Sequence, residues 1–220
     1  MIDLSLIDWV DIAHATTETL LMTGISLLFT VIIGLPLGIL LFLTGPGQLH
    51  AQRSVYRALS LIVNVLRSVP FLILLIMMIP LTLVLVGTSL GVAGAIPPLV
   101  IGTAPFFARL VENVLREIDG GIIEACQAMG AKTYQIICHA LLPEALPGLL
   151  AATTVTAITL MSYAAMSGVI GGGGLGDLAI RYGYQRFQTE VMVITVFVLV
   201  TLVQLMQWLG DGLVQKFTRK

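Results

Sequence analysis

Charged residues are scarce in this chain of 220 residues: they make up only 10% of the total, whereas 57% of the residues are hydrophobic. Soluble globular domains carry about 25% charged residues. So little charge cannot cover a water-facing surface, and the mean hydropathy of +1.01 points the same way. Several uncharged runs approach the roughly 20 residues that cross a bilayer as a helix. The sequence therefore excludes a soluble domain and predicts an all-α, polytopic membrane protein that lies in a lipid bilayer.

Groups that carry catalysis or bind metals are also scarce. The three histidines, His14, His50 and His139, are scattered, and no two acids recur at helical spacing within an apolar run. Membrane enzymes usually carry such a pair or a buried nucleophile, so we expect neither enzymatic activity nor a metal site. The two cysteines, Cys126 and Cys138, are read as small side chains that stay reduced.

Basic residues are absent before Thr23, although four acids precede it: Asp3, Asp8, Asp11 and Glu18. A secretory signal begins with a basic region, so we do not expect one here. Five candidate spans follow, which we take as one transmembrane domain over residues 1–220: Leu20–Leu43, Arg67–Val86 with an alternative start near Ala58, Gly91–Ala108, Leu149–Ile170 and Val191–Leu209.

Proline and glycine predict breaks in two of these spans. The first is expected to be interrupted by Gly34, Pro36 and Gly38, and the third contains Pro97, Pro98 and Pro105. Proline removes a backbone donor and clashes with the preceding turn. In lipid, such breaks survive only where protein or a watery cavity satisfies the freed groups. The third span is therefore expected to be broken and to face protein or a pathway.

The distribution of Lys and Arg predicts the orientation. On one side of the predicted spans lie Arg53, Arg57, Arg67, Arg109, Arg116, Lys132, Lys216, Arg219 and Lys220, and on the other only Arg181 and Arg186. The ratio is nine to two, or eight to two if Arg67 is left out. Because basic loops stay in the cytoplasm, we expect the N-terminus outside and the C-terminus inside.

One long polar loop, residues 119–142, interrupts the apolar pattern on the predicted cytoplasmic side. Asp119 is a candidate N-cap for a helix that begins near Gly120. An apolar face is predicted from Ile118, Ile122, Cys126 and Met129, and Gly130 is placed to end the helix in a left-handed conformation. A second segment begins near Thr133 and runs through Tyr134, Ile137 and Leu141, and we expect Pro143 and Pro147 to terminate it.

Two interpretations of this loop remain open. It is either an amphipathic helix that rests on lipid headgroups or a segment that docks on a soluble partner. A lipid-bound helix is rich in Lys and Arg on its polar face, and this loop offers only Lys132 and His139. Small residues favour insertion into a protein cleft instead: Ala125, Ala128, Gly130 and Ala131.

The loop also resembles a family motif. Glu124-Ala125-Cys126, three residues, Gly130, nine residues and Ala140-Leu141-Leu142-Pro143 resemble the EAA loop of ABC importer permeases, whose pattern is E-A-A, three residues, G, nine residues, I-x-L-P. Cys126 and Ala140 depart from it. Stretches along nearly the whole chain are similar to the methionine-importer branch of the family: Glu18–Thr23, Leu66–Phe71, Ala104–Arg109, Gly171–Gly176 and Tyr182–Tyr184.

The resemblance implies a permease of the type I ABC importer fold in the cytoplasmic (inner) membrane of a bacterium. It implies a homodimer, two cytoplasmic ATPase subunits that bind ATP and Mg, and an extracytoplasmic substrate-binding protein. This chain would hold no cofactor and bind no nucleic acid. The coupling residues would be Glu124, Ala125, Ala128, Met129, Gly130, Leu142 and Pro143. Methionine is the expected substrate, with another amino acid or small solute as the alternative.

The glycine run Gly171–Gly176 formally fits the nucleotide-binding pattern G-x-G-x-x-G. A nucleotide loop needs a strand before it and a helix after it, and neither a strand nor a Lys-Ser/Thr pair is found here. We expect a tight external turn against the transport pathway instead. The energy source would then be another polypeptide.

A translocation path needs polar or adaptable residues inside the spans. Arg67 is either a snorkelling arginine or a cation that lines a vestibule or pairs with Glu112. Met161, Ser162 and Met166 either line a gate or pack as ordinary side chains, and Pro70 and Pro105 complete the candidate path. An ion-coupled secondary transporter remains the rival class. It needs an intramembrane ion site, for which only Arg67 is a candidate.

Overall fold

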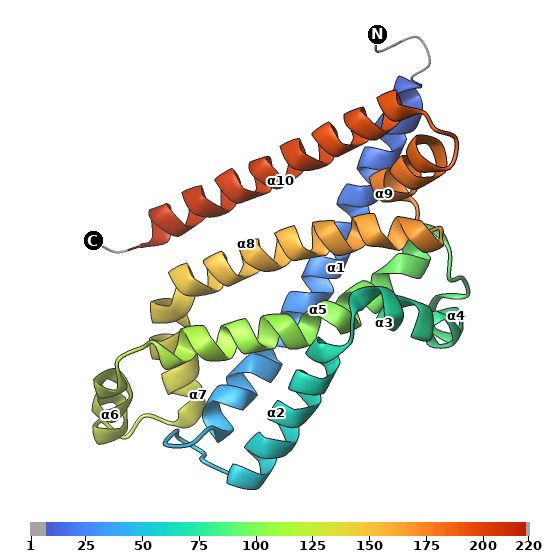
Figure 1. Cartoon of the computed structure of the whole chain (residues 1–220). Coiled ribbons are helices and arrows are strands. Elements are labelled where there is room, and N and C mark those ends of the chain that lie inside the picture. The colour runs from blue at the N-terminus through green and yellow to red at the C-terminus, as the bar shows by residue number, and fades with distance from the viewer. Residues whose placement is uncertain (1–7, 219–220) are drawn as a thin grey trace.

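Helices joined by short turns make up the computed structural model, which describes residues 8–218 (Figure 1). Within these residues, four helical stretches are long and apolar enough to cross a membrane: α1 (Trp9–Thr44), α5 (Gly91–Arg116), Thr133–Ile170 with α8 (Leu142–Ser167) inside it, and α10 (Thr189–Phe217). A fifth exists if α2 (Arg53–Ser68) and α3 (Phe71–Met77), bent by 98°, count as one span. The predicted all-α, multi-span class is confirmed.

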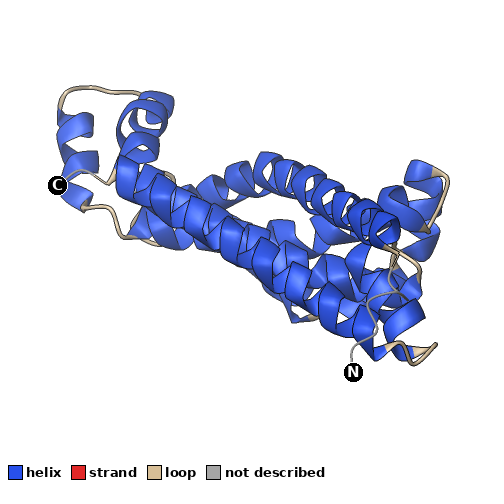
Figure 2. Cartoon of the chain, turned by 90° about the horizontal axis from the view of Figure 1, so that it is seen from above, coloured by secondary structure: helices blue, strands red, loops and turns tan. Residues whose placement is uncertain are grey.

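Helix α5 lies at the centre of the bundle, where it contacts α1, α2, α3, α4 and α8 (Figure 1). Seen from above, the described chain consists of helices and the loops that join them (Figure 2). The expected break in this segment is wrong, because α5 runs unbroken through Pro97, Pro98 and Pro105. Neighbouring helices surround it, and Pro98 and Pro105 are buried. Packing against other helices re-satisfies the backbone groups that a proline frees in lipid. Of the two surroundings predicted for this segment, protein or a pathway, the structure shows packing against protein.

Helix α1 is likewise continuous, so the predicted interruption at Gly34, Pro36 and Gly38 is wrong. The glycines serve helix packing instead. A Cβ atom on Gly34 would lie 2.9 Å from the carbonyl oxygen of Ala104, and one on Gly38 would lie 2.6 Å from that of Ala108. Small residues four apart let the backbones of two membrane helices approach closely.

The predicted second span is wrong as a single helix, because the chain bends after α2. The residue before a proline is pushed out of the α region, and Val69 accordingly has an extended backbone (φ −74°, ψ 125°) before Pro70. Helices α3 and α4 (Ile79–Val86) follow. Gly87, in the left-handed region at φ +77°, ends α4.

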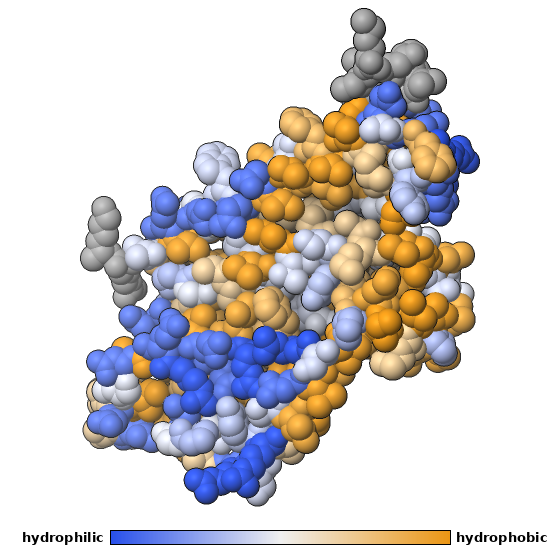
Figure 3. Space-filling view, viewed as in Figure 1, coloured by the Kyte–Doolittle hydropathy of each residue, from blue (hydrophilic) through white to orange (hydrophobic). Residues whose placement is uncertain are grey.

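Polar and apolar surfaces separate along the molecule (Figure 3). Apolar residues gather over α3 and α4, whereas hydrophilic residues gather around α6 (Gly120–Ala128) and the start of α2. The remaining short elements follow α8 at the opposite end: η3 (Gly168–Ile170), α9 (Gly174–Leu178) and η4 (Ala179–Tyr184). This division is what a membrane-spanning chain requires, because lipid faces the apolar band.

Candidate functional site

The polar loop between α5 and α8 begins with helix α6, as predicted. The carboxylate of Asp119 accepts a hydrogen bond from the amide of Gly121 at 2.9 Å, which caps the first turn. The helix ends at Ala128, and Gly130 follows it with a left-handed φ of +76°. The amide of Ala131 then donates to the carbonyl oxygen of Cys126 at 3.0 Å and closes the turn. A Cβ on Gly130 would meet nothing within 4 Å, so this position needs glycine for its backbone conformation alone.

The second half of the loop joins α8 without a break. It consists of α7 (Thr133–Gln135) and a π-helical turn, η2 (Ile136–Leu141), which passes directly into α8. The prediction that Pro143 and Pro147 terminate this segment is wrong. Pro143 lies in the first turn of α8, where a proline is tolerated, and the helix continues through Pro147. The loop is therefore one short helix followed by the N-terminal extension of a long helical stretch, Thr133–Ile170.

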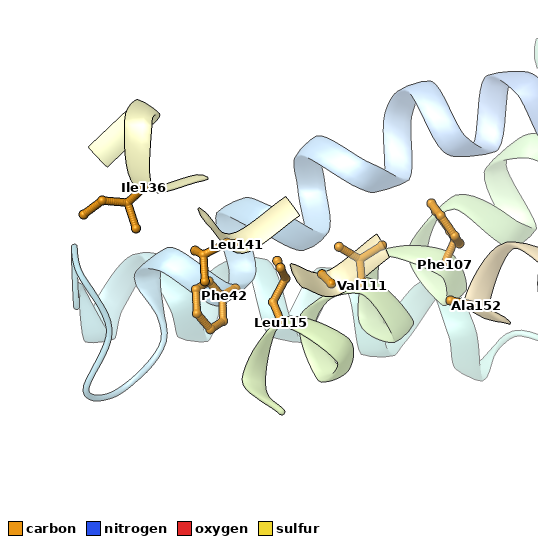
Figure 4. Close-up of a cluster of buried hydrophobic side chains, with 8 residues drawn as sticks. Phe42, Phe107, Val111, Leu115, Ile136, Leu141 and Ala152 are labelled. Carbon is orange, nitrogen blue, oxygen red and sulfur yellow. The ribbon is translucent and has the colours of Figure 1, made fainter. Parts of the chain in front are cut away.

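The inner face of the loop packs on an apolar cluster that α1, α5 and η2 build together (Figure 4). Its buried members include Phe42, Leu115, Ile136 and Leu141, and Ile123 of α6 packs against them. The predicted apolar face is partly wrong, because Met129 points away and is 79% exposed. Ile118 and Cys126, two other members of that predicted face, do pack against the cluster.

Five of the predicted coupling residues lie on the outer face of α6 and in the turn that follows it. Glu124, Ala125, Ala128, Met129 and Gly130 are all exposed. None of the ion pairs formed within residues 8–218 involves the carboxylate of Glu124. Leu142 and Pro143, half-buried and exposed respectively, lie at the start of α8 rather than on α6.

Two hollows flank α6. An open groove of about 500 Å³ separates it from η2 and is lined by Cys126, Met129, Gly130, Ala131, Gln135, Ile136, His139 and Ala140. A second hollow of about 280 Å³ lies towards α1 and includes Arg116, Glu124 and Gln127. Helix α6 therefore presents the exposed carboxylate of Glu124 and several small side chains between two concave surfaces.

The candidate path residues do not gather on one surface of the single chain. Pro105 and Met161 are buried, and the hydroxyl of Thr23 lies 3.9 Å from the sulfur of Met161. Ser162 and Met166 of α8 are exposed, as are Arg67 in the last turn of α2 and Pro70 before α3. Their role in a path stays a prediction.

Arg67 does not pair with Glu112, which was one of its two predicted functional roles. Its guanidinium carbon lies 5.7 Å from the ring centroid of Phe106. The carboxylate of Glu112 is instead held by Arg109 and Arg116 on the same helix. The preceding prediction failed because α5 continues beyond Ala108, which puts Arg109 and Arg116 one turn on either side of Glu112.

The glycine run forms a tight turn, as predicted, but its partner was not anticipated. Gly171, Gly173 and Gly174 have left-handed φ values of +81°, +80° and +73°. The amide of Gly174 donates to the carboxylate of Glu18 at 2.7 Å, and the amide of Leu175 donates to the hydroxyl of Thr19 at 2.8 Å. The signal in the sequence that could have predicted this contact is the pair of polar residues Glu18 and Thr19 in the apolar helix α1. They cap α9 from α1 and hold the turn against it.

Comparisons with known proteins agree with this geometry. Residues 34–219 match the model of the family described as binding-protein-dependent transport system inner membrane component. A probable D-methionine transport system permease protein of Vibrio cholerae is 48% identical over 202 residues, which cover 92% of this chain and 90% of that one. The D-methionine transport system permease protein of Escherichia coli is 58% identical over 151 residues, or 69% and 70% of the two chains.

A solved structure gives the same answer for the fold. A chain from a native crystal form of the inward-facing MetNI methionine ABC transporter is 52% identical and superposes with a TM-score of 0.94, over 95% of this chain and 97% of that one. Sequence identity of 52% over nearly the full length means that the likeness is not confined to the loop motif. The chain belongs to the family of binding-protein-dependent transport system inner membrane components.

Proposed function

We propose that this chain is the permease subunit of an ATP-driven methionine importer. The observation that carries the proposal is the likeness, over nearly the whole chain, to a chain of a solved methionine ABC transporter. Relatives named as D-methionine permeases support the same substrate. The subunit would form the translocation path and leave ATP hydrolysis, with its ATP and Mg, to a separate polypeptide.

The loop 119–142 is the proposed coupling site, seated in a groove of a cytoplasmic ATPase. An exposed carboxylate among small residues suits insertion between protein walls. Glu124 would accept hydrogen bonds from basic or amide groups of the ATPase, and Ala125, Ala128, Met129 and Gly130 would fill the groove beside it. Leu142 and Pro143 would fix the direction in which α8 leaves the loop.

The proposed orientation puts this loop and the C-terminus in the cytoplasm and the N-terminus outside. Residues 44–58, which hold Arg53 and Arg57, lie beside residues 109–148, which hold Arg109, Arg116 and Lys132. Nε2 of His50 is 2.9 Å from the hydroxyl oxygen of Thr133. Adjacent basic segments support a shared cytoplasmic side. A substrate-binding protein would then dock at the opposite end, which carries Arg181 and Arg186. The membrane would be the inner membrane of a bacterium.

A two-fold axis would complete the path. Oligomers of one chain are usually closed and symmetric, and two copies would bring α5 and α8 around one central route. Exposed Ser162 and Met166 on α8, with Arg67 and Pro70, are the proposed lining. Pro105 and Met161 would support it from inside each chain.

Reconstitution tests the function directly. The permease, its ATPase and its binding protein are placed in proteoliposomes, and uptake of labelled methionine is compared with uptake of other amino acids. The proposal predicts uptake that needs ATP and prefers methionine. Preference for another amino acid would overturn the substrate. Uptake driven by a proton gradient without the ATPase would favour the secondary-transporter class.

Charge reversal tests the coupling role. Glu124→Lys should leave the subunit folded, because the side chain is exposed, but should reduce ATP-driven uptake at least tenfold, a loss of about 1.4 kcal/mol of coupling. Asp211→Lys is the matched control, since it reverses an exposed carboxylate on α10. Uptake and ATPase activity are measured together. Normal uptake in Glu124→Lys would remove the coupling role from this residue.

A further inference from the structure

A row of polar groups joins α2 to α5 where two membrane helices would ordinarily meet through apolar side chains. The hydroxyl of Tyr56 donates to Glu112 Oε1 at 3.1 Å. Arg109 donates to Ser60 Oγ at 2.8 Å and to Asn64 Oδ1 at 2.9 Å. Arg116 donates to Glu112 Oε1 at 2.8 Å and lies over the ring of Tyr56, with its guanidinium carbon 5.7 Å from the centroid. We call these six residues the polar seam.

The seam adds polar contacts to a small apolar one. Val63, the one buried residue of this sixteen-residue helix, packs with Leu41 of α1 and Ala108 of α5. Tyr56, Ser60 and Asn64 are spaced four residues apart and therefore form one stripe on the helix. Glu112, only 1% exposed, is the centre of the facing stripe on α5. A buried carboxylate without partners is costly, which favours keeping these groups together when the subunit moves.

The seam also lies between the loop after α5 and the segment beyond the bend after α2. At its C-terminal end, α5 leads through Glu117 into the loop and α6. At its own C-terminal end, α2 passes through the 98° bend into α3, and α4 follows. The hydrogen bond between His50 and Thr133 adds a second link, between the turn before α2 and the loop.

We infer that the polar seam makes α2 and α5 move as one body, so that a displacement of the loop reaches α3 and α4. Glu112 is the positioning residue of this unit, because its carboxylate orients both Arg109 and Arg116. Glu112 and Arg109 then hold the stripe of polar residues on α2 through hydrogen bonds. The inference rests on the proposed function, in which the ATPase displaces the loop. It adds the route by which this displacement would reach α3 and α4.

A distance measurement tests the inference with the seam unaltered. Nitroxide labels are attached at Val65→Cys on α2 and Asn113→Cys on α5, both exposed positions, with Cys126→Ala and Cys138→Ala in the background. The full transporter is measured without nucleotide and after trapping in the ATP-bound state. The inference predicts the same distance in both states, while a label pair between α6 and α10 changes. A change of several ångströms between α2 and α5 would overturn it.

A variant that removes only the hydrogen-bonding groups of α2 tests the function of the seam. Tyr56→Phe, Ser60→Ala and Asn64→Leu together remove every hydrogen bond that crosses the seam and leave the Arg109–Glu112–Arg116 cluster intact within α5. Methionine uptake per ATP hydrolysed should fall by about fivefold or more, while ATPase activity persists. Ser54→Ala with Ser68→Ala is the matched control, because it removes exposed hydroxyls from the same helix outside the seam.

The two measurements separate this inference from the proposed function. If the unmodified transporter shows no ATP-driven methionine uptake, the proposed function fails. If it shows uptake and the seam variant transports as many molecules per ATP as the control, the seam inference fails alone. Should the seam variant not assemble, the distance measurement on the unaltered seam still decides, because it needs no substitution within the six residues.

Discussion

Helix α5 meets its neighbours α1 and α2 in two opposite ways. Against α1 the contact depends on shape: Gly34 and Gly38 bring the two backbones so close that a Cβ would collide with carbonyl oxygens of α5. Against α2 the contact depends on charge and hydrogen bonds, which centre on the buried carboxylate of Glu112. Helix α5 is thus fixed on one side by steric fit and on the other by polar groups.

The difference has an energetic basis. Apolar side chains gain little from meeting one another in lipid, so membrane helices associate through close packing or through polar contacts. The α1–α5 contact uses the first means over a long crossing. The α2–α5 contact uses the second, in a helix whose surface is mostly exposed. Each contact should therefore respond to a different kind of substitution.

Removal of the central carboxylate is expected to have the largest effect. Glu112→Leu leaves Arg109 and Arg116 without their shared partner, and breaking a buried ion pair from one side costs about 3–5 kcal/mol. The free energy of unfolding in mixed micelles, with increasing SDS, measures the loss. Glu117→Leu is the control, because this carboxylate is exposed at the end of α5. Equal stability of the two variants would mean that the seam does not hold α2.

Overpacking the close contact is expected to come next. Gly38→Leu puts side-chain atoms where a Cβ would already lie 2.6 Å from Ala108 O and Val111 Cβ. Overpacked sites typically lose about 1–3 kcal/mol. The matched control is Gly24→Leu on the same helix, where a Cβ meets nothing within 4 Å. A small effect at both positions, in the same SDS titration, would show that α1 and α5 do not need close approach.

The smallest effect is expected for the one hydroxyl pair that α1 and α5 share. Thr30 and Thr103 lie 2.8 Å apart, and Thr103 donates to the carbonyl oxygen of Leu99, so Thr30 is the donor between them. Polar contacts between membrane helices average about 0.6 kcal/mol, and Thr30→Val should lose about that much. Thr17→Val removes an exposed hydroxyl and serves as the control. A loss as large as that of Glu112→Leu would contradict the steric account of this contact.

Local chemistry made much of the architecture predictable from the sequence. The caps of α6, Asp119 and Gly130, act within a few residues, and the structure has both as predicted. Helix continuity was not predictable in the same way. Pro105 does not interrupt α5, and Pro147 does not interrupt α8. Surrounding helices make up for the backbone hydrogen bond that a proline removes, and those helices are distant in the sequence. Gly38 was misread for the same reason, since its partner Ala108 lies on another helix.

The candidate site and the polar seam likewise contain local features that the sequence predicts and contacts between helices that it does not predict. The exposed residues of α6 follow from a motif within thirty residues, and the structure keeps Glu124 and Ala128 on one outward surface. The partners of Glu112 could be found only in part: Arg109 and Arg116 are at helical spacing from it, but Tyr56, Ser60 and Asn64 belong to another helix. Registers between helices decide such contacts, and a single sequence does not carry them.

The central claim is that the outer face of α6 touches an ATPase. A photo-cross-linking amino acid at Met129, whose side chain is 79% exposed, tests it in membranes that contain the intact transporter. The same group at Trp9, which is 58% exposed at the start of α1, is the control. The account predicts a cross-link from Met129, and none from Trp9, to the ATPase subunit. A cross-link from Met129 to lipid alone, or to a protein outside the cytoplasm, would contradict it.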